Sequence, residues 1–296
     1  MSKVIYQHII YRDCSGTDIQ FTVKRLDMIH PTINGNKWYK LKYNIEAALK
    51  LEVPRILTFG GSHSNHIYAT ASAGNHYGIE TVGVIRGEDG DSETLKFARE
   101  MGMHLHFISR TEYREKNEKE NIGKLEKLFG PFHLVPEGGS NKEGVNGCME
   151  ILSEEDKEYD NIFVACGTGA TLAGIALSAS GKQTIYGVSV LRKGDFLERD
   201  VKNHIIEHLK EVSMVSNFKI LTEYHCGGYA KWNQSLINLI GEMHFEFQLP
   251  LDQVYTAKMI SAFLDMSTKG EIDITQKSLC IHTGGLQGRI KEAIFS

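Results

Sequence analysis

Short apolar runs alternate with amphipathic stretches along almost the whole chain, and this alternation constrains the fold more than any other feature. The apolar runs are short enough for buried strands, and the stretches between them place apolar residues at helical spacing. This pattern is typical of β-α-β units, so we expect an α/β fold with a mostly parallel sheet and ligands at the strand carboxyl ends. The predicted strands are Arg55–Gly60, Thr81–Gly87, His104–Ser109, Asn161–Gly167, Thr184–Arg192, Phe218–His225 and Ser278–Gly285.

Helices are predicted between these strands. They include Ser64–Gly78, Ser92–Gly102, Ala170–Ser180 and Phe196–Lys210, with two more before the last strand. The charged segment Thr111–Phe129 carries Ile122, Leu125 and Leu128 at helical spacing. It therefore predicts a solvated helix with one apolar stripe rather than a charged binding tail.

Composition and charge narrow the class of function. The chain has 296 residues, 41% of them hydrophobic, which is enough for a sizeable core. A net charge of -4 with both signs interspersed argues against nucleic acid and anionic membranes as partners, so we expect a small-molecule partner. Five scattered cysteines without a Cys-x-x-Cys pair indicate a reducing cytoplasm rather than a disulfide framework or zinc site. No signal peptide or apolar stretch of about 18 residues is apparent, so we expect neither export nor membrane insertion.

The first segment that could carry chemistry is Asn34–Tyr43, where an Asn-Gly turn leads into a predicted helix. Lys37 lies near the start of that helix. The positive end of the helix dipole, together with Lys40 and Lys42, would lower the pKa of Lys37 and favour the neutral amine that forms imines. Taken alone, Lys37 also fits an ordinary surface lysine.

The second segment is Gly60–His66, at the end of a predicted strand and the start of a helix. Free backbone N–H groups, the Ser64 hydroxyl and the Asn65 amide could hold a carboxylate there. A glycine turn followed by a serine N-cap is the alternative. His63 and His66 have no third ligand nearby in sequence, so we expect no metal.

The third segment is Cys166–Thr171, between a predicted strand and helix. Its glycines allow close approach of an anion, and the threonine hydroxyls add donors, which is typical of a phosphate site. A dinucleotide-binding fingerprint fits less well, because the third glycine comes at Gly174 and the acidic residue, Asp195, comes late. The fourth segment combines Leu251–Lys258 and His282–Gly285, which fit either a pocket lining or a helix cap and glycine turn.

Together and in this order, the four segments resemble the 1-aminocyclopropane-1-carboxylate (ACC) deaminase and D-cysteine desulfhydrase family of tryptophan-synthase-β-like, fold-type II, pyridoxal-phosphate enzymes. The resemblance spans Asn34–Gly285 and includes Asn-Lys, Ser-Asn-His, Gly-Thr-Gly-x-Thr, Val-Tyr-Thr-x-Lys and His-Thr-Gly-Gly. It implies two three-layer α/β/α domains with mostly parallel twisted sheets, in a homodimer. Residues 1–42 and 148–296 would form a large cofactor-binding domain, and residues 43–147 a small domain.

The resemblance also implies a site. Pyridoxal 5'-phosphate (PLP) would be held as a Schiff base by Lys37, with Asn65 reaching its phenolic oxygen. The substrate carboxylate would be held by Ser64, Asn65 and the His66 backbone, and Ser64 would also be an active-site hydroxyl. The phosphate would bind Gly167, Thr168, Gly169, Ala170 and Thr171. Tyr255 would be a second catalytic group beside the ring, Tyr229 a second substrate-pocket tyrosine, Thr256 the partner of the pyridine nitrogen, and Thr283 a further cofactor contact.

Thr256 and Thr283 favour the desulfhydrase branch. ACC deaminases carry a glutamate at the first position, which stabilises a protonated pyridine and a strong electron sink, and tend to carry an aliphatic residue at the second. A neutral threonine implies a weaker sink, sufficient when a β thiol departs. We therefore expect a lyase that converts D-cysteine to pyruvate, ammonia and hydrogen sulfide. The alternatives are an ACC deaminase, a PLP-binding protein without robust catalysis, suggested by the unusual segment Cys226–Trp232, and, remotely, an NAD-binding dehydrogenase.

Overall fold

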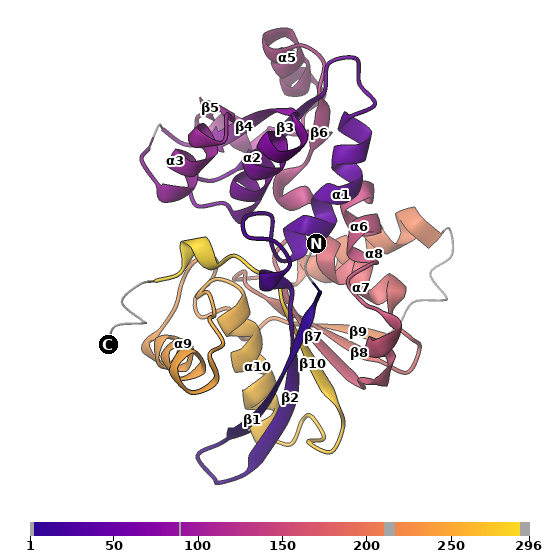
Figure 1. Ribbon diagram of the computed structural model, residues 1–296, viewed down its shortest axis with the longest axis vertical. Coiled ribbons are helices and arrows are strands. Elements are labelled where there is room, and N and C mark those ends of the chain that lie inside the picture. The colour runs from indigo at the N-terminus through magenta and orange to yellow at the C-terminus, as the bar shows by residue number, and fades with distance from the viewer. Residues whose placement is uncertain (1–2, 89, 210–216, 291–296) are drawn as a thin grey trace. The chain divides into compact units, whose positions relative to one another are not determined.

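The computed structural model describes residues 3–88, 90–209 and 217–290, which form two compact units, each built on its own sheet (Figure 1). The large unit joins Met1–Asn36 to Cys148–Ser296, and the small unit is Lys37–Gly147. Both sheets are mostly or wholly parallel, which confirms the predicted α/β fold.

The sheet of the large unit has six strands in the order β1-β2-β10-β7-β8-β9. These strands are β1 (Ile5–Arg12), β2 (Asp18–Arg25), β7 (Asn161–Cys166), β8 (Thr184–Ser189), β9 (Asn217–Leu221) and β10 (Ser278–His282). Neighbours from β2 to β9 pair in parallel, whereas β1 pairs antiparallel with β2. The β1–β2 hairpin is not among the elements expected from the alternation of strands and helices, because it precedes the first β-α-β unit.

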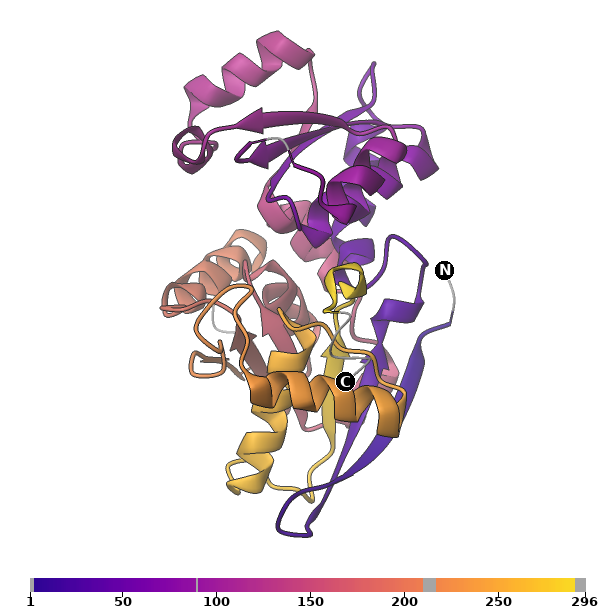
Figure 2. The same cartoon turned by 90° about the vertical axis from the view of Figure 1, so that its left-hand side faces the viewer.

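Helices cover both faces of this sheet. They are α7 (Ala170–Ser178), α8 (Phe196–Leu209), α9 (Gln234–Phe247) and α10 (Thr256–Thr268). Figures 1 and 2 show α9 and α10 on one side of the strands and α7 and α8 on the other. Aromatic packing joins α10 to the sheet, since the Phe263 ring centroid lies 4.9 Å from that of Phe21 and 5.2 Å from that of Phe163. None of the helices within the described ranges has the length and hydropathy that a membrane span requires.

The small unit has a four-stranded parallel sheet in the order β5-β4-β3-β6. Its strands are β3 (Arg55–Gly60), β4 (Glu80–Arg86), β5 (His104–Ile108) and β6 (His133–Val135), and its helices are α1 (Asn36–Ala48), α2 (Asn65–Tyr77), α3 (Glu93–Glu100), α4 (Arg110–Arg114), α5 (Lys119–Phe129) and α6 (Lys142–Cys148). Ile67 and Leu95 pack helices α2 and α3 against one face of the sheet. Tyr113 and Leu125 pack α4 and α5 against the other.

The charged segment Thr111–Phe129 differs from the prediction. It forms parts of two helices, α4 and α5, instead of one. Ile122 and Leu125 pack toward the sheet as predicted, but Leu128 is 59% exposed, and Phe129 takes the third apolar position. In a helix, residue 128 lies about 120° around the axis from residue 122, whereas residue 129 lies about 20° from it. The buried stripe therefore follows Phe129.

Three of the segments singled out in the sequence follow strands at their carboxyl ends. Gly61–Ser64 follows β3, Gly167–Gly169 follows β7, and Thr283–Gly285 follows β10. In open parallel sheets, ligands bind at this end of the strands.

Candidate active site

Ser64 is the N-cap of α2, the helix that follows β3. Its backbone is extended, with φ −72° and ψ 119°, and its hydroxyl accepts hydrogen bonds from His66 N at 3.2 Å and Ile67 N at 3.3 Å. Asn65 is the first helical residue. The structure therefore shows the serine N-cap, and a carboxylate at this helix start would use the same N–H groups.

His66 has a fixed tautomer. Thr58 Oγ1 donates its single proton to Val135 O at 2.7 Å, so it must accept at its 2.8 Å contact with His66 Nε2. Within the described part of the chain, His66 Nδ1 is buried without a hydrogen-bond partner. Burial, followed by the charges of Lys37 and Lys40, holds the pKa of His66 well below its usual value. The ring is therefore neutral, with the proton on Nε2.

This buried histidine predicts a loss of stability in mild acid. The unfolded chain binds a proton at His66 below its ordinary pKa of 6.5, whereas the folded chain does not, so the free energy of unfolding falls as the pH falls below that value. Between pH 6.5 and pH 5, we expect His66→Gln to make this slope shallower by up to about 1.4 kcal/mol per pH unit in urea unfolding. The matched control, His63→Gln at an exposed position, should keep the slope of the unmodified chain. An unchanged slope in His66→Gln would contradict the assignment.

His63 and His66 face different surroundings, since the first is exposed and the second is buried. In the ranges that the structure describes, no cluster of three or more His, Cys, Asp or Glu side chains is arranged to hold a metal ion.

Lys37 is the second residue of α1, and the chain that leads to it is anchored in the large unit. Gly35 N donates to Leu26 O at 2.8 Å, and Asn36 N donates to Thr283 O at 3.3 Å. The Asn36 side chain also donates through Nδ2 to Thr171 Oγ1 at 2.9 Å. The residue before Lys37 therefore contacts both the predicted phosphate loop and the Thr283 loop. Asn36 has no role predicted from the sequence, although it is part of the Asn-Lys motif.

The glycine loop after β7 fits an anion. Gly169 has φ +83° and lies just before α7, and a Cβ there would be 3.0 Å from Val201 Cγ2. Glycine adopts this left-handed conformation without strain, and alternation of backbone conformation around such a residue turns successive N–H groups toward one side. Thr171 is buried in the first turn of α7, whose N-terminal end favours negative charge. The loop thus meets the requirements of a phosphate cradle.

Tyr255 lies against this loop. A Cβ on Gly167 would be 3.4 Å from Tyr255 Cε1, so the tyrosine ring lies beside this glycine and a larger residue there would touch it. The Tyr255 hydroxyl donates to the Tyr229 hydroxyl at 3.3 Å, and the two rings are nearly perpendicular, with centroids 6.1 Å apart. The structure therefore brings Gly167, Tyr255 and Tyr229 together.

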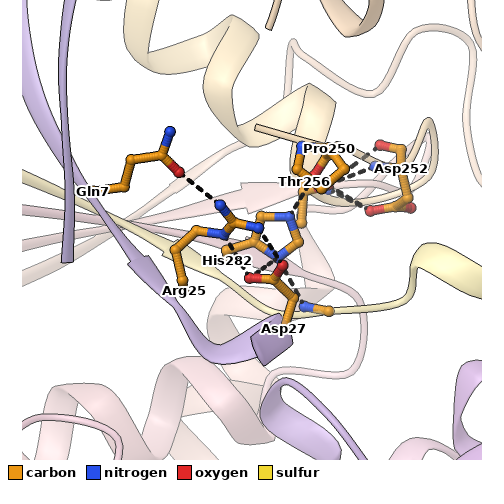
Figure 3. Close-up of polar contacts among 8 residues, drawn as sticks. Gln7, Arg25, Asp27, Pro250, Asp252, Thr256 and His282 are labelled. Atoms are coloured by element: carbon orange, nitrogen blue, oxygen red, sulfur yellow. Dashed lines mark hydrogen bonds and ion pairs between the residues drawn. The ribbon is translucent and has the colours of Figure 1, made fainter. Parts of the chain in front are cut away.

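Thr256, the first residue of α10, is buried and forms hydrogen bonds with Asp252 (Figure 3). Its hydroxyl donates to Asp252 Oδ1 at 2.7 Å and accepts from Asp252 N at 2.8 Å. The Asp252 carboxylate also accepts from the backbone N–H groups of Val254, Tyr255 and Thr256, each at 2.9 Å. Asp252 has no role predicted from the sequence either, although an aspartate just before a helix is a capping signal.

A second buried network supports the loop that carries Thr283. His282 Nε2 lies 2.7 Å from Pro250 O, and its Nδ1 lies 3.3 Å from Asp27 Oδ1 (Figure 3). Asp27 accepts two hydrogen bonds from Arg25, at 2.9 and 2.7 Å. Burial opposes ionisation of Asp27, but His282 and Arg25 outweigh it and lower the pKa of the carboxyl. This network ties the end of β10 to the residues just before Asp252.

Known proteins share this architecture. The profile of the family described as pyridoxal-phosphate dependent enzyme matches residues 12–284. This chain belongs to that family. Among its relatives is a putative ACC deaminase of Thermotoga maritima, 32% identical, with 90% of this chain and 88% of that protein covered. Another is the bifunctional D-cysteine desulfhydrase/ACC deaminase, mitochondrial, of Arabidopsis thaliana, 29% identical, with 93% and 74% covered.

A solved structure agrees with these relatives. The crystal structure of a protein described as the ACC deaminase homologue superposes with a TM-score of 0.85 and 26% identity, covering 97% of this chain and 91% of that one. The chain is thus a PLP-dependent enzyme of the ACC deaminase and D-cysteine desulfhydrase family, and the resemblance found in the sequence is confirmed.

Proposed function

We propose that this enzyme is a lyase that removes the β substituent of a small amino acid, with D-cysteine as its substrate. The observation that carries the proposal is Thr256, a neutral side chain at the position where ACC deaminases carry glutamate. Thr256 directly follows Tyr255, whose hydroxyl is held by Tyr229. A modest electron sink, next to a tyrosine hydroxyl that can act as a general acid, suits the loss of a thiol leaving group.

The residues of the chain suit PLP. The left-handed Gly169, the glycine backbone of the loop and the Thr171 hydroxyl supply the donors that a phosphate needs. In this proposal, Gly167, Thr168, Gly169, Ala170 and Thr171 bind the phosphate, Lys37 holds the cofactor covalently, and Asn65, Thr256 and Thr283 contact it. When bound, PLP supplies an electron sink that stabilises negative charge at the substrate Cα.

Other residues bind the substrate and move its protons. Ser64, Asn65 and the His66 N–H hold the carboxylate at the start of α2. Lys37 takes the proton from the substrate Cα, and Tyr255, hydrogen-bonded to Tyr229, donates a proton to the departing sulfur. Addition of water completes the balance, so that D-cysteine and water give pyruvate, ammonia and hydrogen sulfide.

A panel of amino acids tests the substrate. We expect D-cysteine to give keto acid faster than L-cysteine, D-serine or ACC, with ACC at least about tenfold slower, a barrier difference of roughly 1.4 kcal/mol. The measurement is keto acid release at equal enzyme concentration. Turnover of ACC alone would contradict the choice of D-cysteine.

ACC deamination is the second candidate. It is favoured by the name of the Thermotoga maritima relative and by the two activities in the name of the Arabidopsis thaliana relative. The same panel separates the candidates, because ring opening of ACC gives a four-carbon keto acid and no hydrogen sulfide.

We further propose that the enzyme is a cytoplasmic homodimer. All five cysteines lie in the described ranges, and all five are free thiols, which fits a reducing compartment. Light scattering after size-exclusion chromatography should give twice the mass of 33.2 kDa. A monomeric mass would contradict the dimer.

A further inference from the structure

The hydrogen bonds between Asp252 and Thr256 restrict what the Thr256 hydroxyl can offer to a third group. A hydroxyl has one proton and two acceptor lone pairs. The proton of Thr256 Oγ1 is directed to Asp252 Oδ1 at 2.7 Å, and one lone pair accepts from Asp252 N at 2.8 Å (Figure 3). The hydroxyl therefore retains one lone pair and no proton, and it can only accept from any further partner.

Because the Thr256 hydroxyl can only accept, a further partner must be a hydrogen-bond donor. A pyridine nitrogen donates a hydrogen bond only when it is protonated, and it accepts one when it is not. If the cofactor's ring nitrogen lies at Thr256, as the proposed function holds, an unprotonated nitrogen would meet a lone pair there and be repelled. The protonated nitrogen would complete a chain from ring N–H to Thr256 Oγ1 and from Thr256 to the Asp252 carboxylate.

We propose that Asp252 is a positioning residue that acts through Thr256 to favour the protonated form of the cofactor's ring nitrogen. The inference rests on the proposed function, because it requires the ring nitrogen to contact Thr256. The electron sink stays weaker than the one that the glutamate of ACC deaminases gives, because the Asp252 carboxylate acts from one hydrogen bond behind Thr256.

The surroundings of Asp252 support this role. The residue is 2% exposed, so its negative charge is weakly screened by water. The positive end of α10 would oppose a protonated ring nitrogen, but the same carboxylate accepts the N–H groups of Val254, Tyr255 and Thr256 at that end. The nearby Lys258 donates through Nζ to Gly228 O at 2.9 Å. Desolvation by burial is the main cause that lowers the pKa of Lys258.

The test is a ¹⁵N spectrum of holoenzyme reconstituted with PLP labelled at the ring nitrogen. In the unmodified enzyme, we expect the ring nitrogen to resonate in the protonated range. Asp252→Asn should shift it toward the unprotonated range, because the neutral amide no longer attracts the proton of Thr256. The double variant Asp252→Asn/Thr256→Glu should restore the protonated signal by placing a carboxylate beside the ring.

Asp273→Asn is the matched control. Asp273 also accepts from a threonine N–H and hydroxyl, those of Thr275 at 2.9 and 2.7 Å, but it is exposed on the surface of the same unit. This variant should leave the ¹⁵N shift unchanged. If Asp252→Asn does not fold, Thr256→Ser and Thr256→Val provide the comparison, since serine keeps the lone pair and the protonated signal and valine loses both.

Two results would overturn the inference. One is an unprotonated ring nitrogen in the unmodified holoenzyme, and the other is an unchanged shift in Asp252→Asn with the cofactor bound. Failure of the proposed function gives a different result. The substrate panel would then show keto acid from ACC and none from D-cysteine, whatever the ¹⁵N shift of the ring nitrogen.

Discussion

Replacing Lys37 with alanine should lower the turnover of D-cysteine by about 10³-fold or more, because the variant loses both the amine that holds the cofactor and the base that takes the Cα proton. The rate of keto acid release, with the cofactor in excess, is the measurement. The visible absorbance of the bound cofactor should change in the same variant, since no imine to the protein can form.

Glu46→Ala is the control for this prediction. Glu46 lies in the same helix and is exposed. This variant should keep turnover within a few-fold of the unmodified enzyme. Equal losses in Lys37→Ala and Glu46→Ala would indicate damage to α1 rather than the loss of a catalytic amine.

Gly35→Ala should destabilise the protein by about 3 kcal/mol, the sum of a left-handed backbone cost and overpacking. Gly35 has φ +65°, and a Cβ there would lie 1.9 Å from Thr283 O and 2.3 Å from Thr283 C. Both atoms belong to the backbone, so relief would require one of the two loops to move. Urea unfolding measures the loss, and cofactor affinity should fall with it because Gly35 precedes Asn36 and Lys37.

Gly16→Ala separates the two costs. Gly16 has φ +85°, but among the described residues no heavy atom lies within 4 Å of the position that a Cβ would take there. Its substitution should therefore cost only the backbone strain, about 1 to 2 kcal/mol. Equal losses at the two glycines would contradict the close approach of Gly35 to Thr283.

Local patterns in the sequence predict much of the fold. The apolar run Arg55–Gly60 and the serine before Asn65 define a strand and a capped helix through short-range chemistry, and the structure has both. The face of α5 that is buried is harder to predict, because Leu128 and Phe129 are both apolar. Only the packing of the helix against the sheet determines that Phe129 is partly buried and Leu128 exposed. The β1–β2 hairpin lies outside the alternating pattern altogether.

In the candidate site too, some residues are predictable from local sequence patterns and others depend on contacts between distant parts of the chain. Lys37, Ser64 and the glycine loop stand out because each lies at a turn or helix start. Asp27 does not, because its partner His282 is distant in the sequence and no local spacing links them. The direction of the Thr256 hydroxyl likewise depends on three-dimensional hydrogen bonding, although the spacing from Asp252 is a recognisable capping pattern.

The central claim is that Lys37 holds the cofactor, and reductive trapping tests it most directly. Purified enzyme saturated with PLP would be reduced with borohydride, digested and mapped by mass spectrometry. We predict one phosphopyridoxyl group, on the peptide that contains Lys37 and at that lysine. A modification at a different lysine, or none in cofactor-saturated protein, would contradict the account.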